Sequence, residues 1–400
     1  MMVQDMTALE QGLVEFLRAF EPCFLQTRSY EKLAAYGVGL LTDIKRKSIE
    51  PIALAGGGPP RTLQLWLSNT RWDDGLGRRI MHYRVAARVD PGRIGVLDSS
   101  GHVKQGKKTP GVQRQWCGEV GKKENCVIGQ HLLYTNNDAV NPFSCMLASD
   151  LFLPDKEWSQ DRERCREAGI PDTLAHRPKW KIGIEQVEQA MGNGIRFDWI
   201  IGDSDYGTIH DFWFELDRLG QQGVAEVSPR FVCWATPPSC RSGRAEHSSK
   251  RVDNLATYSP VFTEQAWTEH TIKLTTRGPA VWKVKSAPVQ LVAEPDPGHH
   301  GKSVPTDRRY WLIVAHNPKT DETKYLVSNA SASTDVADIL RAMWARWHVE
   351  KWFERAKQEA GLGAFEVRTY ISLIRHWLIV GMLMLFVAEQ TESLRKKTAG

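Results

Sequence analysis

The stretch RAMWARWHVEKWFERAKQEAGLGAFEVR, residues Arg341 to Arg368, decides how the rest of the chain is interpreted. It has no proline and no glycine before Gly361, and it is rich in Ala, Glu, Lys, Arg and Trp, which predicts a helix. The Gly-Leu-Gly sequence then supplies a helix end. Arg346, Glu350 and Lys357 follow at spacings of four and seven, so we expect them on one helical face. Pairs of oppositely charged residues at this spacing are also common on ordinary solvated helices. Acidic residues elsewhere in the chain must therefore indicate whether these three residues belong to a functional site.

The composition describes an ordinary globular protein of more than one domain. The chain has 400 residues, of which 42% are hydrophobic and 25% charged. Its net charge of +5 is compatible with a polyanionic partner but does not identify one. Basic residues gather locally, at 45–47, 107–108, 122–123 and 395–397.

Cysteine usage and hydropathy indicate the compartment. The seven cysteines show no Cys-x-x-Cys spacing, and the sequence shows no signal peptide, so we expect reduced thiols in the cytoplasm. The most apolar run, Trp377 to Ala388, is too short to span a bilayer and predicts a buried helix. His299 and His300 are assigned to an exposed loop.

Residues 1–90 are predicted to form a helical N-terminal DNA-binding domain. Apolar spacing indicates helices at 6–20 and 29–47, and two shorter helices flank the glycine-rich turn at 56–60. That pair resembles a helix-turn-helix in outline, although such pairs also occur in plain helical domains. Lys45, Arg46, Lys47 and Arg61 are the candidates for phosphate contact.

The middle of the chain changes to strands. Residues 91–227 are predicted to form the first part of an α/β core, in which one strand ends at Asp98 and another at Asp203. Residues 228–337 carry short apolar strands among Pro, Ser, Thr and Gly, which predicts a β-rich insertion. Residues 338–400 return to helix and complete the core.

Three acids in this order can perform metal chemistry. Asp98, Asp203 and Glu350 would repel one another at a sheet edge unless a cation neutralised them. Hard carboxylate oxygens suit two Mg²⁺ or Mn²⁺ ions, which activate a nucleophile and stabilise the leaving oxygen of a phosphodiester. Arg346 and Lys357 would hold DNA phosphates nearby. Taken singly, each aspartate is equally well explained as a turn or cap residue.

Several motifs together resemble one family. These are LLTDIKRKSIEPIA, PPRTLQLWLSNTRWD, VLDSSG, GVQRQWCGEVGKKENC, DWIIGDSDYG and RWHVEKWFERAKQEAGLGAFEVR. The chain resembles the IS701 family of bacterial insertion-sequence transposases, within the wider IS4-like DDE group. The resemblance covers nearly the whole chain and implies an RNase H-like catalytic core with a β-rich insertion.

The resemblance also implies residue roles. Asp98, Asp203 and Glu350 look like the metal-binding DDE acids. The late helix looks like the motif Tyr-x2-Arg-x3-Glu-x6-Lys, with Met343 at the tyrosine position as a departure. Asp205 is also unusual, because a small residue is expected there.

Further basic and aromatic residues have two interpretations. Lys107, Lys108 and Arg114, with Lys122 and Lys123, would line a DNA groove or belong to solvated turns. Trp234, Trp267 and Trp282 lie in the predicted insertion. An insertion aromatic can stack on a flipped base in related transposases, but core packing explains these residues as well.

The sequence therefore predicts a DDE transposase. It would bind terminal inverted repeats, cut DNA with two Mg²⁺ or Mn²⁺ ions, and join the 3′-hydroxyls to target DNA. We expect a homodimer in the synaptic complex and a cytoplasmic, nucleoid-associated protein without a membrane partner. The alternatives are a metal nuclease of the same fold and a catalytically inactive transposase-derived DNA-binding protein, which the departure at Met343 keeps open.

Overall fold

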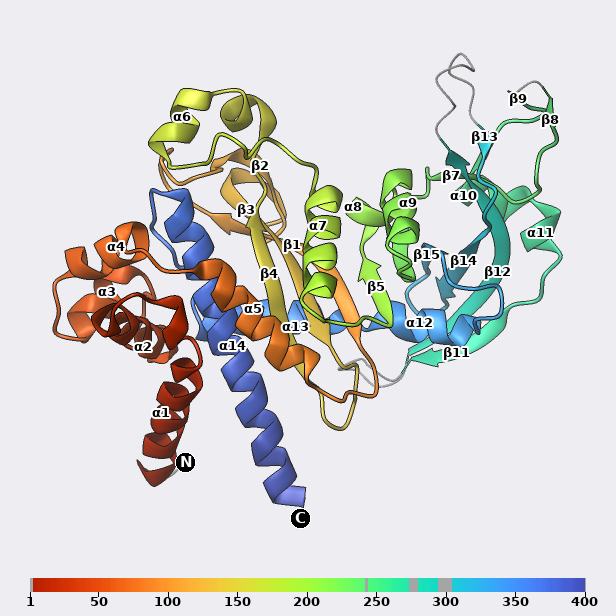
Figure 1. The fold of residues 1–400 in the computed structure, drawn as a ribbon. Coiled ribbons are helices and arrows are strands. Elements are labelled where there is room, and N and C mark those ends of the chain that lie inside the picture. The colour runs from red at the N-terminus through yellow and green to blue at the C-terminus, as the bar shows by residue number, and fades with distance from the viewer. Residues whose placement is uncertain (1–2, 242–243, 273–279, 294–303, 400) are drawn as a thin grey trace. The chain divides into compact units, whose positions relative to one another are not determined.

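The computed structural model describes residues 3–241, 244–272, 280–293 and 304–399, and it confirms a mixed α/β chain (Figure 1). The chain divides into two compact units. Unit 1 comprises Met1–Gly92, Asp98–Arg196 and His348–Gly400, and unit 2 comprises Arg93–Leu97 and Phe197–Trp347. The division passes between Leu97 and Asp98, inside one strand.

Unit 1 contains the N-terminal helices, a group of antiparallel strands and the C-terminal helices. The helical elements are α1 (Val3–Arg18), η1 (Glu21–Cys23), α2 (Thr27–Leu41), α3 (Ile49–Ala55), α4 (Pro60–Asn69), α5 (Asp74–Ala86), η2 (Asp155–Ser159), α6 (Arg162–Glu167), α7 (Lys179–Gly192), α13 (Trp347–Glu359) and α14 (Tyr370–Ala399). The strands are the later part of β1 (Ile94–Val103), β2 (Gln113–Cys117), β3 (Lys122–Thr135) and β4 (Ser144–Leu151). β2 and β4 both pair antiparallel with β3.

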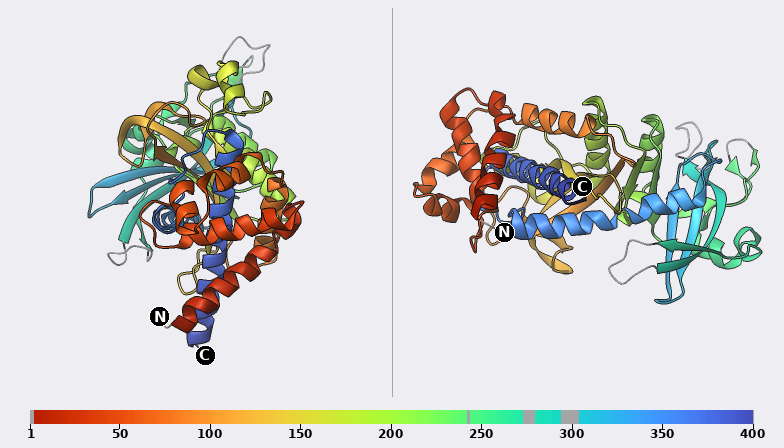
Figure 2. Two further views of the ribbon diagram at one scale, coloured as in Figure 1. Left: turned by 90° about the vertical axis from the view of Figure 1, so that its left-hand side faces the viewer. Right: turned by 90° about the horizontal axis from the view of Figure 1, so that it is seen from below.

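Helix α14 is the centre of unit 1. It passes between the N-terminal helices and β4, and its lower half runs beside α1 (Figure 2). Phe386 packs against Phe16 with ring centroids 5.5 Å apart, and buried Arg375 donates to the carbonyls of Leu67 and Thr70. The helix is long and apolar enough to cross a membrane, but 83% of that apolar window is buried inside the protein. The prediction of a buried helix is therefore confirmed, but the prediction that it is too short to span a bilayer is wrong, because the helix continues on both sides of the apolar run.

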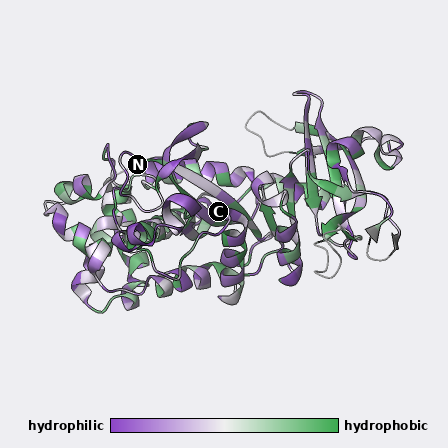
Figure 3. Ribbon diagram, turned by 90° about the horizontal axis from the view of Figure 1, so that it is seen from above, coloured by the Kyte–Doolittle hydropathy of each residue, from purple (hydrophilic) through white to green (hydrophobic). Residues whose placement is uncertain are grey.

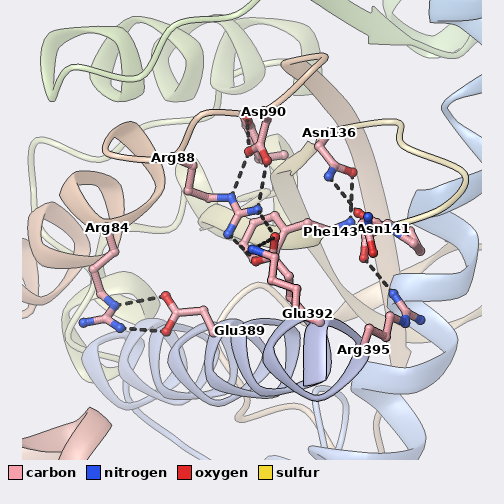
Figure 4. A network of polar contacts seen from close by, with 12 residues as sticks. Arg84, Arg88, Asp90, Asn136, Asn141, Phe143, Glu389, Glu392 and Arg395 are labelled. Carbon is pink, nitrogen blue, oxygen red and sulfur yellow. Dashed lines mark hydrogen bonds and ion pairs between the residues drawn. The ribbon is translucent and has the colours of Figure 1, made fainter. Parts of the chain in front are cut away.

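A network of ion pairs fastens α5 and the residues after it to the end of α14 (Figure 4). Arg84 makes a two-pronged contact with Glu389, with the shorter N–O distance 2.6 Å. Arg88 bridges Asp90 and Glu392, at 2.8 and 2.9 Å. Donation from Arg88 lowers the pKa of Glu392, which shows that this carboxylate is stabilised in its charged form.

The predicted helix 29–47 ends early. Helix α2 stops at Leu41, where Thr42 turns to an extended conformation. The ammonium group of Lys47 folds back and donates to the carbonyls of Leu40 and Thr42, at 2.8 and 2.7 Å. These bonds satisfy helix-end carbonyls, so the basic segment 45–47 is a loop and not a helical turn.

Unit 2 is built on a mixed sheet. Its strands, besides the first residues of β1, are β5 (Trp199–Gly202), β6 (Gly223–Val227), β7 (Val232–Trp234), β8 (Cys240–Arg241), β9 (Arg244–Ala245), β10 (Lys250–Arg251), β11 (Thr268–Ile272), β12 (Ala280–Ala293), β13 (Val304–Pro305), β14 (Tyr310–Asn317) and β15 (Glu322–Ser328). Its helices are α8 (Ser204–Gly207), α9 (His210–Arg218), α10 (Val252–Tyr258), α11 (Pro260–Thr263) and α12 (Val336–Trp344).

The strand order of unit 2 places the parallel strands together. β1, β5 and β6 are parallel neighbours, and β15, β14 and β12 continue from β6 in antiparallel pairs. Buried residues alternate with more exposed ones along β12, because one of its faces packs inward, whereas β5 is buried along most of its length. Figure 3 shows hydrophobic and hydrophilic residues on the strands of the sheet. The short apolar strands predicted within residues 228–337 include β12, β14 and β15, so their presence is confirmed. His299 and His300 lie outside the described residues.

Candidate functional site

Asp98 lies inside a strand and not at its end. β1 continues to Val103, because the backbone of its second half pairs with β3 and buries Ser100 and His102. The polar Ser-Ser-Gly sequence predicted a strand end at Asp98, but backbone pairing with β3 extends the strand beyond that residue despite the low strand preference of the sequence. Asp98 is half-buried, and its Oδ1 accepts from the Ser99 amide at 2.7 Å.

Asp203 directly follows β5 and caps the short helix α8. Its Oδ1 accepts from the Asp205 amide at 2.9 Å, so Asp203 is the N-cap of this helix. Asp203 is half-buried and Asp205 is exposed. A Cβ atom on Gly207 would lie 2.3 Å from the carbonyl oxygen of Glu226 on β6, so glycine allows the close packing that fixes this turn.

Glu350 and Lys357 share helix α13, but Arg346 does not. The predicted single helix is interrupted: α12 ends at Trp344, and Ala345 and Arg346 form a tight turn with i to i−3 hydrogen bonds. The expectation of one face for all three residues is therefore wrong for Arg346. No glycine or proline marks this break in the sequence.

Side-chain packing explains the break. Trp344 packs against Trp282 of unit 2, with ring centroids 5.3 Å apart. Phe353 packs against His131 of unit 1 at 5.2 Å. The two halves of the predicted helix thus belong to different hydrophobic cores, and the break falls where the two units divide.

Within unit 1, the end of β1 adjoins the end of α13. A Cβ atom added to Gly363 would lie 2.9 Å from His102 Nδ1. Burial, and then the charges of Lys104 and Lys357, lower the pKa of His102 well below its ordinary value. Lys104 Nζ donates to the carbonyls of Gly363 and Phe365, both at 2.8 Å. The strand that carries Asp98 therefore meets the segment that follows the helix of Glu350.

The three acids are divided between the units: Asp98 and Glu350 belong to unit 1, and Asp203 belongs to unit 2. Within the described parts of the chain, no group of three or more His, Cys, Asp or Glu residues is arranged to hold a metal ion. The metal-binding roles of these acids stay predictions. The donor set fits a hard divalent cation by its chemistry, because all three side chains are carboxylates.

A basic groove in unit 1 gathers most of the predicted DNA-binding residues. Its volume is about 1760 Å³. Seven of the residues predicted to contact DNA line it: Lys45, Arg46, Lys47, Arg61, Lys107, Lys108 and Lys357. Lys104 and Arg368 also line it. Four acids, Asp43, Glu50, Glu359 and Glu366, leave the lining with an excess of positive charge. Arg114 and Arg346 are not among its lining residues.

The basic side chains of the groove differ in what they contact. Lys47 is held by helix-end carbonyls, and burial lowers its pKa. Lys104 lies 3.6 Å from the centre of the Phe365 ring, and burial lowers its pKa to about 8. Arg46 pairs with Glu366, and both side chains are mostly exposed. Lys104 was not among the residues predicted to contact DNA, although its place three residues before Lys107 was a usable signal.

The three insertion tryptophans behave differently from one another. Trp234 and Trp282 are buried, at 3% and 5% exposure, and pack in the core. Trp267 is 43% exposed, and Lys285 lies over its ring at 4.8 Å. Six cysteines, at 23, 117, 126, 145, 165 and 233, are free and buried.

Comparison with known proteins adds a family assignment. The family described as "DDE superfamily endonuclease" matches residues 19–279. The chain is also similar to the "Probable transposase for insertion sequence element IS701" of Microchaete diplosiphon, with 27% identity over 218 residues. That match covers 53% of this chain and 53% of the relative, so the chain spans about half the length of the curated relative it matches.

Proposed function

Because the chain belongs to the DDE superfamily endonucleases, we propose that it is an insertion-sequence transposase that binds terminal inverted repeats, cuts DNA at the element ends and joins those ends to target DNA. The family assignment and the similarity to an IS701 transposase support this function. A dimer would hold two ends together in the cytoplasm, on the nucleoid.

The register of two parallel strands is the observation that carries the proposal. Val96 of β1 pairs with Ile201 of β5. Asp98 and Asp203 each come two residues later, at the carboxyl side of neighbouring parallel strands, where the functional groups of α/β sheets commonly gather. This shared offset supports the proposal that the two aspartates belong to one site.

Glu350 completes the proposed triad from helix α13. The end of β1 contacts the segment after α13, because a Cβ atom on Gly363 would lie 2.9 Å from His102 Nδ1 and Lys104 Nζ donates to the carbonyls of Gly363 and Phe365. This contact within unit 1 supports the proposal that Asp98 and Glu350 belong to one site. The proposed core is RNase H-like.

In this proposal each side chain has a defined task. Asp98, Asp203 and Glu350 would hold two Mg²⁺ or Mn²⁺ ions, which supply Lewis-acid chemistry for phosphodiester cleavage when bound. The Ser99 and Asp205 amides orient the two aspartates by hydrogen bonds to one oxygen of each. Lys357 and Arg346 would bind the phosphates that flank the cleaved bond.

A strand-transfer assay tests the function. The substrate is a duplex that ends in the inverted repeat found beside the gene, already cut to expose its 3′-hydroxyl. With Mg²⁺ and a circular target plasmid, a transposase joins the duplex covalently to the plasmid. Cleavage without joining would identify a nuclease, and binding without cleavage would identify an inactive DNA-binding protein.

A further inference from the structure

We propose that the basic groove of unit 1 is a composite binding site for the phosphate backbone of double-stranded DNA, which the N-terminal helices and the core must build together. This inference rests on the proposed function, because it takes DNA as the substrate. It adds where the DNA lies and which segments hold it.

One side of the groove comes from the N-terminal region. Arg61, Gln64 and Ser68 line it from α4, at spacings of three and four, so they form one polar face of that helix. Arg, Gln and Ser side chains are common donors to phosphate oxygens. The loop before α3 adds Lys45 and Arg46, which are both exposed.

The other side comes from the core. The loop after β1 contributes Lys107 and Lys108, which are exposed. Lys357 contributes from α13, where it also lies 3.4 Å from Glu119. The groove thus collects cations from segments more than 300 residues apart in sequence, and positive charge from both sides matches the two phosphate strands of a duplex.

The segment that follows α13 also lines the groove. Gly361, Gly363 and Phe365 are among the lining residues, and Lys104 holds this segment through two carbonyls. Lys357 is two turns from Glu350 on α13. A duplex bound along this segment therefore approaches the helix of the proposed catalytic acid, which connects the groove to the chemistry.

Glu366 limits the affinity of the groove. It lines the groove, carries the same charge as DNA and pairs with Arg46. A bound phosphate must replace Glu366 as the partner of Arg46. Replacing Glu366 with glutamine removes that competition, so the groove should then bind DNA more tightly.

The test measures duplex binding at several salt concentrations, in EDTA so that no cleavage occurs. The probe is a random-sequence DNA duplex of about 30 base pairs. Five full-length variants are compared with wild type: Lys45→Ala with Arg46→Ala, Lys107→Ala with Lys108→Ala, all four changes together, Glu366→Gln, and Lys396→Ala with Lys397→Ala. The last pair is the matched control, because it removes two exposed charges at the end of α14, outside the groove lining.

Each groove pair should reduce the slope of log K against log salt by about 2 units, and all four changes should reduce it by about 4. The affinity lost by either pair should then be about 10-fold greater at about 50 mM salt than at about 200 mM. The control should keep the wild-type slope, and Glu366→Gln should bind more tightly than wild type. Circular dichroism and melting temperature verify that each protein is folded.

The outcomes separate this inference from the proposed function. If either groove pair keeps the wild-type slope while the protein is folded, the groove is not a composite site. If wild type and the variant with all four groove substitutions have the same slope of log K against log salt, DNA binds outside the groove. In both cases, Mg²⁺-dependent cleavage by wild type would still support the proposed function. A duplex RNA that is bound more tightly than DNA, with the same dependence on the groove, would overturn DNA as the partner.

Discussion

At the residue scale, each proposed catalytic aspartate has both a structural and a chemical role. Asp203 caps α8, and Asp98 accepts from the next amide in the chain. These bonds are what a cap or turn residue makes in any protein, so they do not by themselves identify a metal ligand. Asparagine caps as well as aspartate but has no charge, so it separates the two roles.

Asp203→Asn should therefore fold like wild type and lose DNA cleavage. Asp205→Asn should keep substantial cleavage with the same metal requirement, because Asp205 is exposed and its amide, not its carboxylate, makes the capping bond. Cleavage assays on both purified variants, with circular dichroism as the folding control, decide between the two acids. The opposite pattern would assign the metal site to Asp205.

Lys104 should make stability depend on pH. Burial lowers its pKa to about 8 from an ordinary 10.5. Between these values the unfolded chain keeps a proton that the folded protein has lost, so the free energy of unfolding rises with pH in this window. The gain from this residue is at most about 3 kcal/mol. Neutral lysine still has two N–H groups for Gly363 and Phe365.

Denaturant unfolding from about pH 7.5 to about pH 10 measures this effect as a difference between proteins. Wild type should gain stability relative to Lys104→Met as the pH rises. Lys122→Met, which replaces an exposed lysine, should follow wild type. Parallel curves for wild type and Lys104→Met would show that Lys104 titrates normally.

At the scale of elements, the sequence predicted most helices and strands but missed several ends. Apolar patterns located the helix predicted at 6–20 and the strand that ends at Asp203 to within a few residues of α1 and β5. The ends of β1 and α2, and the break before α13, depend on partners distant in sequence. β1 is extended by its pairing with β3, and α2 ends where the ammonium group of Lys47 binds the carbonyls at its end. The helix breaks before α13 because Trp344 and Phe353 pack in separate cores. No local pattern encodes such contacts.

The end of α13 should be sensitive to substitution. Gly361 has φ of +66°, and a Cβ atom there would lie 2.8 Å from Lys47 Cβ. Gly361→Ala should cost more than the ~1–2 kcal/mol of the left-handed conformation alone. Gly106 also has positive φ, at +81°, but a Cβ atom there would meet nothing within 4 Å. Gly106→Ala should cost only the conformational part, and equal losses of unfolding free energy would contradict this account.

At the scale of the whole molecule, the sequence provided the three acids and seven groove residues but not their arrangement. Lys45, Lys107 and Lys357 are far apart in sequence, and only the fold of unit 1 brings them to one groove. Buried Arg375 and Phe386 of α14 also contact residues near the start of the chain. Contacts at such separations leave no spacing pattern in a single sequence.

A fragment of residues 1–92 should therefore not fold by itself, because it lacks α14. Tyr36 would lose its hydrogen bond to His376, and the carbonyls of Leu67 and Thr70 would lose Arg375. Circular dichroism should show reduced helix and no cooperative melting, in contrast to the full chain. A cooperative transition in the fragment would show that the N-terminal helices are an independent domain.

The central claim is that Asp98, Asp203 and Glu350 form the metal-dependent site, and cleavage by a Glu350 variant tests it most directly. Glu350→Gln is compared with Glu354→Gln, which changes an exposed glutamate one turn further along α13. With an inverted-repeat duplex and Mg²⁺, wild type and Glu354→Gln should cut and EDTA should stop them. Glu350→Gln should bind the duplex but cut it more than about 100-fold more slowly. Near-normal Mg²⁺-dependent cutting by Glu350→Gln would show that the assigned triad is wrong.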